Sequence, residues 1–206
     1  MTPPDPDTRE LVSYLTLRRI VGILGVALPV LLAVWSLAHR IGLLPSISDY
    51  YSLRTRDMFV GILFTIAWFL FAYRGYDDRD ATAGKIACIF ALGVAIFPNS
   101  GTPLEGRLHY GCAAALFLVL SYFALALFTK TGGSPTPNKL IRNRVYRTCG
   151  VIMLACIAAI GLGTVLLAEA TRNALRLVFW LEALALWAFG VSWFVKGETL
   201  WRDAEA

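Results

Sequence analysis

Residues 177–195 read LVFWLEALALWAFGVSWFV, and the only ionisable side chain in this stretch is that of Glu182. A hydrocarbon core of about 30 Å requires roughly 20 apolar residues in an α-helix. The stretch therefore predicts a transmembrane helix. An ionisable residue inside such a helix is rare and marks a functional site by default. Glu182 consequently bears on both the fold and the function.

The rest of the 206-residue chain is similarly apolar, with 57% hydrophobic and 16% charged residues. Soluble domains have about 45–50% apolar and about 25% charged residues. This composition excludes disorder, a nucleic-acid-binding module and an ordinary cytosolic enzyme. The formal net charge of +5 indicates cationic loops beside anionic lipid. We expect membrane lipids as partners and no nucleic acid.

Five further apolar runs approach the length of a transmembrane helix, although Lys85 interrupts the start of the third of the six runs. The predicted spans are Ile20–Ala38, Met58–Tyr73, Ala81–Phe97, Tyr110–Phe128, Gly150–Ala168 and Leu177–Val195. The sequence therefore predicts an all-α integral membrane bundle of six transmembrane helices over residues 20–197.

The segments outside the bundle are short. Residues 1–19 are predicted to form a cytoplasmic tail, which contains an interfacial helix at Leu11–Arg19, and residues 198–206 form a second tail. Residues 130–147 are predicted to form a flexible cytoplasmic loop, with Gly132, Gly133 and two prolines at its start.

Orientation follows from the distribution of Lys and Arg between alternate loops, because cytoplasmic loops carry the excess. With six spans, one face holds six of the 19 Lys and Arg residues, and the opposite face holds the other 13. The six are Arg40, Arg54, Arg56, Arg107, Arg172 and Arg176. This asymmetry predicts that both termini are cytoplasmic.

The predicted outward face is the one with six Lys and Arg residues. Most of its polar residues lie in two loops, residues 45–57 and 98–109. Part of this polarity has a structural explanation, because Ser46-x-x-Asp49 and Thr102-x-x-Glu105 have capping-box spacing. Other groups are not explained in this way. His109 is predicted to lie at the membrane boundary, four residues after Glu105 and on the same helix face.

We predict that these residues form an outward-facing polar pocket. His109, Asp49 and Glu182 are the candidate catalytic residues, with His109 the best suited to proton transfer at neutral pH. An arginine would hold an anionic headgroup. The candidate ligand-binding residues are Ser46, Ser48, Arg56, Asp57, Glu105 and Arg107.

The expected partner of Glu182 is a cation, because an unpaired carboxylate about 8 Å inside the hydrocarbon would cost a few kcal/mol. Arg56 begins the second predicted span on the same membrane face. We expect Glu182 to face the bundle interior within hydrogen-bond reach of Arg56 or, failing that, of His109 or Arg107.

No cofactor and no metal site are expected. Zinc would have to use His109 with Asp49, Asp57 and Glu182, and two histidines in the whole chain are a poor inventory for zinc. A haem between His39 and His109 would lie unusually near the helix ends. The four cysteines lie in or at the start of apolar runs, where we expect them to pack as small hydrophobic residues.

Several short sequence motifs resemble those of a group of bacterial six-span inner-membrane proteins whose activity is uncharacterised, and this resemblance implies a location in a bacterial inner membrane. The motifs are Pro45-Ser46-Ile47-Ser48-Asp49-Tyr50-Tyr51, Arg56-Asp57-Met58-Phe59-Val60-Gly61, Tyr73-Arg74-Gly75-Tyr76, Glu182-Ala183-Leu184-Ala185, Phe189-Gly190-Val191-Ser192-Trp193 and Lys196-Gly197-Glu198. More distantly, Ser46-Ile47-Ser48-Asp49 after the first span resembles the Frag/DRAM/Sfk membrane family, which implies a role in remodelling lipid anchors. The chain also resembles the ceramidase and adiponectin-receptor superfamily but lacks its H-x-x-x-H pair.

The favoured function is that of a membrane protein that binds or modifies a lipid or another amphiphilic small molecule. A small transporter or channel is the alternative from a second class, although such proteins place polar groups near the midplane. A structural or sensory subunit without catalysis is the third. A serine hydrolase built on Ser48, Asp49 and His109 lacks the G-x-S-x-G elbow, and the oligomeric state is not readable from the sequence.

Overall fold

The computed structural model describes the backbone of residues 6–201 and the side chains from Tyr14 onward, and every regular element in this part is helical. The long helices are α1 (Pro6–Ala38), α2 (Arg56–Ala72), α3 (Asp78–Ile96), α4 (Pro103–Tyr122), α5 (Pro137–Leu166) and α7 (Leu177–Lys196). The short elements are η1 (Ser48–Ser52), η2 (Phe123–Leu127) and α6 (Glu169–Ala174). The predicted tails fall partly on residues 1–5 and 202–206, which lie outside the described residues.

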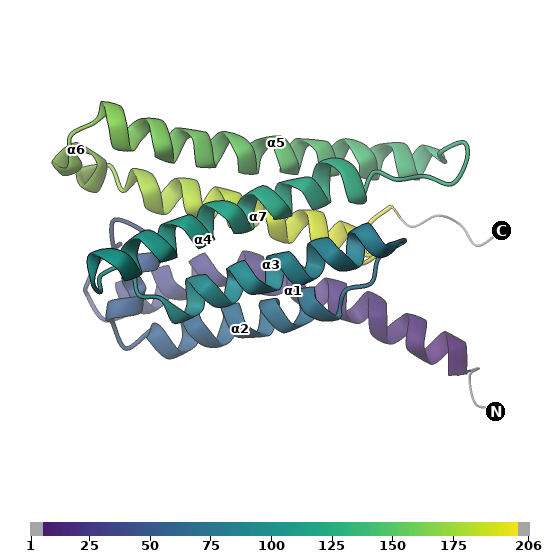
Figure 1. Cartoon of the computed structure of the whole chain (residues 1–206), viewed down its shortest axis with the longest axis horizontal. Helices are drawn as coiled ribbons and strands as arrows, with labels where there is room; N and C mark the ends of the chain where they lie inside the picture. Colours follow the sequence, from purple (N-terminus) through teal and green to yellow (C-terminus); the bar gives the residue numbers. More distant parts are fainter. Residues whose placement is uncertain (1–5, 202–206) are drawn as a thin grey trace.

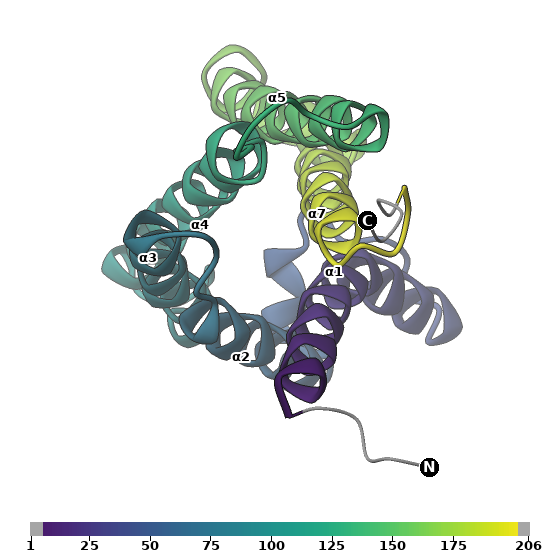
Figure 2. The same cartoon turned by 90° about the vertical axis from the view of Figure 1, so that its right-hand side faces the viewer.

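The six long helices run alongside one another (Figure 1) and form a closed ring in the order α1, α2, α3, α4, α5 and α7, which Figure 2 shows end-on. Two ends can be distinguished. The Glu182 end carries the loops around residues 39–55, 97–102 and 167–176, and the Lys139 end carries residues 73–77 and 128–136. Helix α1 begins and helix α7 finishes at the Lys139 end.

Four of the described helices are long and apolar enough to cross a membrane. These candidate spans are Tyr14–Ala38, Pro103–Leu127, Pro137–Leu166 and Leu177–Lys196. Helix α2 has 17 residues, and α3 begins with Asp78-Arg79-Asp80. The chain is therefore compatible with a membrane protein, and its helices correspond in position to the six predicted runs.

Two helices begin earlier than the sequence predicts. Helix α1 is continuous from Pro6, so the predicted interfacial helix and first span are one element. Helix α5 begins at Pro137 because the Thr136 hydroxyl caps it by accepting the Lys139 N–H at 3.0 Å, and proline suits a first helical position. The loop predicted over residues 130–147 therefore ends at Thr136.

The closest backbone approach joins α1 to α7. A Cβ on Gly190 would lie 2.6 Å from the Gly22 carbonyl oxygen, and a Cβ on Gly22 would lie 2.7 Å from the Gly190 carbonyl oxygen. Small residues allow this approach, which drives helix association in membranes. This contact joins the first and last helices of the ring.

The turn between α2 and α3 is tied to the loop between α4 and α5. Asp77 caps α3, and its carboxylate accepts the Arg79 and Asp80 N–H groups. Asp80 is fully buried, and it accepts from Lys130 Nζ at 2.7 Å. The hydrogen bond from Lys130 lowers the pKa of Asp77 to about 2.

The core at the Lys139 end is aromatic. Tyr73, Phe123, Phe128, Tyr146 and Trp193 are buried and form a connected set of ring contacts. The π-helical turn η2 lies in this cluster, and the Phe128 N–H donates to the Phe123 carbonyl oxygen at 2.8 Å. The wider turn brings both phenylalanine rings to the inside of the bundle.

Candidate functional site at the Glu182 end

The segment after α1 folds over the helix ends and is held by reciprocal caps. The Ser46 N–H donates to Asp49 at 2.9 Å, and the Asp49 N–H donates to the Ser46 hydroxyl at 3.1 Å. This geometry confirms the predicted capping box. Two further bonds attach the segment to other elements: Asn99 Nδ2 donates to Asp49 at 2.7 Å, and the Phe179 N–H donates to the Pro45 carbonyl oxygen at 2.9 Å.

Glu182 lies one and a half turns into α7 and points at this segment. Its carboxylate accepts the Ile47 N–H at 2.7 Å, and the Ser48 N–H is a second donor. Charge-assisted hydrogen bonds of this kind are about twice as strong as neutral ones. Glu182 therefore points inward, as predicted, but its partners are backbone N–H groups.

The predicted cationic partner is wrong. The Arg56 guanidinium donates to the Tyr51 hydroxyl at 3.2 Å and lies over the Tyr51 ring at 4.8 Å. The backbone folds so that amide groups reach Glu182 directly, which supplies donors inside the bundle without burying a second charge. Glu182 therefore joins α7 to the segment that closes the Glu182 end.

His109 is fully buried at the same end. Its Nδ1 lies 2.7 Å from the Phe97 carbonyl oxygen, and its Nε2 lies 2.8 Å from the Ser48 hydroxyl. Because a carbonyl oxygen only accepts, Nδ1 carries the proton, and Nε2 accepts from Ser48. The imidazole of His109, a residue of α4, therefore links the C-terminal end of α3 and the turn at Ser48 to α4.

A serine–histidine pair could suggest acyl transfer, but access to Ser48 is restricted. Ser48 is 6% exposed, and the apolar cavity beside it and Glu182 has a volume of about 50 Å³. A water molecule occupies about 30 Å³ in the liquid, so this space does not hold an ester substrate. The geometry favours a positioning role for the pair.

A larger cavity of about 760 Å³ opens on the other side of Glu182. Its polar lining comes from the 45–49 segment, α4, α6 and the ends of α5 and α7, whereas its apolar lining comes from α4, α5 and α7. The polar residues are Ser46, Asp49, Tyr110, Thr164, Glu169, Arg172, Asn173 and Glu182. The apolar residues include Ala113, Ala114, Phe117, Ile157, Ile160 and Val178.

The cavity gathers three of the residues predicted for the site, namely Ser46, Asp49 and Glu182. Ser48 and His109 lie directly behind them, in the hydrogen-bonded layer described above. Glu105 serves instead as the other half of the capping box with Thr102, as its spacing predicts.

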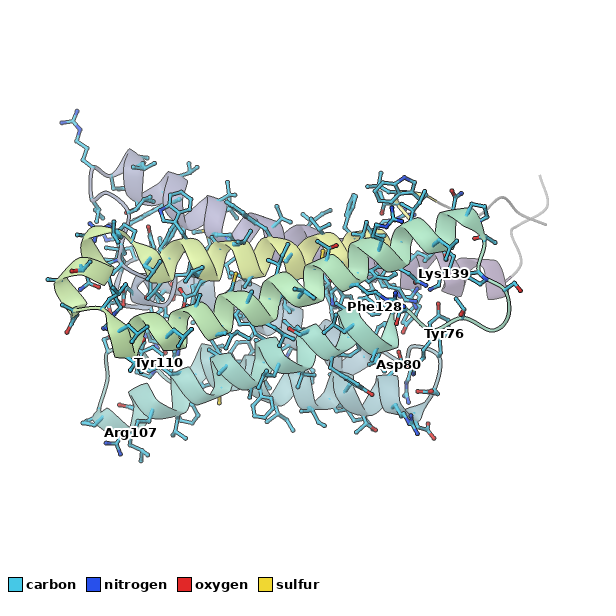
Figure 3. All side chains as sticks on the ribbon, turned by 90° about the horizontal axis from the view of Figure 1, so that it is seen from above. Tyr76, Asp80, Arg107, Tyr110, Phe128 and Lys139 are labelled. Carbon is cyan, nitrogen blue, oxygen red and sulfur yellow. The ribbon has the colours of Figure 1, made fainter. Side chains whose placement is uncertain are left out.

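The remaining predicted residues do not line the cavity. Arg56, Asp57 and Arg107 have exposed side chains, and Figure 3 shows Arg107 on the outside of the bundle. A place near a helix start explains this for the two arginines, because a long charged side chain there extends to the interface. The arginines expected to hold an anionic headgroup are therefore outside the cavity.

Sequence reasoning missed Tyr110, Arg172 and Asn173 as site residues. Tyr110 directly follows His109, and Arg172 and Asn173 lie in α6, a short helix between two long ones. Arg172 donates to the Thr164 and Leu167 carbonyl oxygens at 3.1 Å, which attaches α6 to the end of α5. The signal in the sequence that could have indicated Arg172 and Asn173 is the polarity of residues 169–176 in an otherwise apolar region.

Within residues 14–201, no group of three or more His, Cys, Asp or Glu side chains is arranged to hold a metal ion. The four cysteines are free, and three of them are buried. No protein-family model, curated protein or solved structure matches this chain.

Proposed function

We propose that the protein is a six-span membrane protein that binds a zwitterionic amphiphile in the cavity beside Glu182. The observation that carries this proposal is the division of that 760 Å³ cavity into a polar rim and an apolar wall. Small-molecule sites have volumes of about 300–1,000 Å³ and a few convergent polar groups. An amphiphile matches both parts of such a lining.

The charges of the rim favour a headgroup with both signs. Asp49, Glu169 and Glu182 supply carboxylates, and Arg172 supplies a guanidinium. An ammonium group would complement the carboxylates, and a phosphate would complement Arg172, because arginine donors match phosphate geometry. Acyl chains would pack along the α4 and α5 residues of the wall. The probe that fits this description is phosphatidylethanolamine.

The proposal concerns binding in the first place. His109 is hydrogen-bonded to the Ser48 hydroxyl and to the Phe97 carbonyl oxygen. These bonds support a role for His109 and Ser48 in maintaining the conformation of the rim. A chemical step on the bound amphiphile would require His109 to exchange one of these bonds for the substrate. The transporter and the structural-subunit alternatives lack a comparable observation in their favour.

Filling the cavity tests the proposal. Ala114→Trp should reduce retained phosphatidylethanolamine several-fold, because the indole would occupy the apolar wall. The control is Ala158→Trp, at an exposed α5 position that does not line the cavity. Native mass spectrometry of protein purified from mixed phosphatidylethanolamine and phosphatidylglycerol is the measurement. Equal retention by wild type and both variants, or no preference between the two lipids, would contradict the proposal.

The six-span arrangement is also part of the proposal. Lys130 bonds to Asp77 and Asp80, so the α2–α3 turn lies at the same end of the bundle as the α4–α5 loop. If α4 crosses the membrane, α2 and α3 then cross beside it. We place this end in the cytoplasm of a bacterium, because it carries the excess of Lys and Arg.

Cysteine labelling tests this topology. Arg74→Cys and Pro135→Cys should react with an impermeant maleimide only after the cells are opened, whereas Ser100→Cys should react in intact cells. All three positions have exposed side chains. Labelling at position 74 from outside would reduce the spans to four, and labelling at position 135 from outside would reverse the orientation.

A further inference from the structure

The seam between α4 and α5 is tight near the middle of the bundle and open toward the Glu182 end. Gly150 and Gly161 lie about three turns apart on α5 and therefore face the same direction. A Cβ on Gly150 would lie 2.5 Å from the side chain of Leu125, in the turn that continues α4, so the helices are in close contact there. A Cβ on Gly161 would meet nothing within 4 Å. Helices α4 and α5 therefore diverge toward the Glu182 end, as Figures 1 and 2 both show.

The cavity beside Glu182 occupies the gap that this divergence leaves. Its apolar wall residues on α4 and α5 are all half-buried, whereas the adjoining Leu116 and Cys156 are buried in the core. Helix α7 closes the inner side of the cavity with Val178 and Glu182. The gap between α4 and α5 therefore leads to the outer surface of the ring, which faces lipid in a membrane. We call this gap, between residues 110–118 and 154–164, the lateral opening.

The cavity is too short to enclose a membrane lipid. Along α4 its wall extends from Tyr110 to Phe117, which is about 10 Å at about 1.5 Å per residue. One leaflet accounts for half of a hydrocarbon core of about 30 Å, so an acyl chain in that leaflet extends over about 15 Å. The end of the chain must therefore continue beyond the wall.

The core of the bundle leaves no room for the end of the chain. Leu120 and Met153, the next inward-facing residues of α4 and α5, are buried in the hydrophobic core. Leu118 and Leu154 flank the lateral opening at the same depth, and both are exposed. The chain can therefore pass between Leu118 and Leu154 into the surrounding bilayer without displacing a core residue.

We propose that the ligand of this cavity is a bilayer lipid that enters sideways, through the lateral opening, from the leaflet at the Glu182 end. The inference rests on the proposed amphiphile site and adds the source and the route of its ligand. The headgroup binds at the polar rim, while the ends of the acyl chains stay in the leaflet. The chains are never transferred to water, where apolar groups are unfavourable.

Photolabelling with phosphatidylethanolamine that carries a diazirine at the end of one acyl chain tests this route. The full-length protein is reconstituted in nanodiscs that contain a trace of the probe. We expect saturable labelling at Leu118 and Leu154 that excess unlabelled phosphatidylethanolamine abolishes. Ile23 and Val34, exposed on α1, are the control for bulk lipid, and their labelling should not saturate.

The result that would overturn the lateral route differs from the one that would overturn the site. Competed labelling confined to Leu120 and Met153, or no competed labelling at Leu118 and Leu154, would overturn the route. If a probe with its diazirine at the middle of the chain is still competed at Phe117, the amphiphile site stands without the lateral route. If neither probe is competed anywhere, both proposals fail.

A bulky side chain at the lateral opening provides an independent test. Gly161→Trp places an indole there, and the space around the Gly161 Cβ position admits it. Leu162→Trp, at an exposed position on the outer face of the same helix, is the matched control. Replacement of bound phosphatidylethanolamine by the photolabelled lipid should slow about tenfold in Gly161→Trp and less than about twofold in Leu162→Trp. Equal replacement rates in the two variants would overturn the proposal.

Discussion

Gly190→Ala is expected to destabilise the protein by about 1–3 kcal/mol, which is the usual cost of overpacking. The added Cβ would lie 2.6 Å from the Gly22 carbonyl oxygen and 2.9 Å from the Val26 backbone nitrogen. Backbone atoms cannot move aside as a side-chain end can, so α1 and α7 would have to separate. Alanine is intrinsically the better helix former by about 0.5–1 kcal/mol, and the measured loss is therefore the difference between the two effects.

Gly161→Ala is the matched control on α5. A Cβ at that position would meet nothing within 4 Å, so the helix preference acts alone and stability should rise slightly. Reversible unfolding in mixed micelles, followed by tryptophan fluorescence, measures both variants. If Gly190→Ala were as stable as Gly161→Ala, the close approach of α1 and α7 would be contradicted.

Glu182→Leu is expected to cost about 1–3 kcal/mol, because the Ile47 N–H would lose its acceptor inside the bundle. Ile47 is 3% exposed, so water does not replace the carboxylate readily. The same substitution should release the segment that carries Ser46 and Asp49 and should abolish retention of the amphiphile. Hydrogen exchange at residues 46–50 would report the release directly.

Glu182→Gln is the conservative control, since its amide oxygen still accepts the Ile47 N–H. This variant should lose less than about 1 kcal/mol, the difference between a neutral and a charge-assisted bond. Its amphiphile retention should fall nonetheless, because one carboxylate of the rim is gone. Equal stability of the Leu and Gln variants would contradict the hydrogen bond to Ile47.

The helices and the inward placement of Glu182 could be predicted from the sequence, because both depend on composition along one element. Apolar runs such as residues 177–195 must be helical in lipid, where every backbone group needs an internal partner. A lone carboxylate in such a run must face the interior. The caps at Ser46 and Thr102 were also predictable, since they connect residues three apart.

The partners of Glu182 could not be predicted, because they are backbone N–H groups of a distant loop. Every residue except proline has a backbone N–H, so the sequence does not indicate which of them bind Glu182. Side-chain charge alone favours Arg56 instead. The same limit applies to α6 and Tyr110, which reach the cavity only through the packing of α4 against α5.

Photocrosslinking tests the central claim, the binding of an amphiphile beside Glu182, most directly. A phosphatidylethanolamine with a diazirine at the middle of one acyl chain, added in trace amounts to nanodiscs, would label the residues that its chain touches. We expect saturable labelling at Phe117, Ile157 and Ile160, which excess unlabelled phosphatidylethanolamine abolishes. Labelling spread over exposed α5 residues such as Val151 and Leu162, unaffected by the competitor, would contradict the claim.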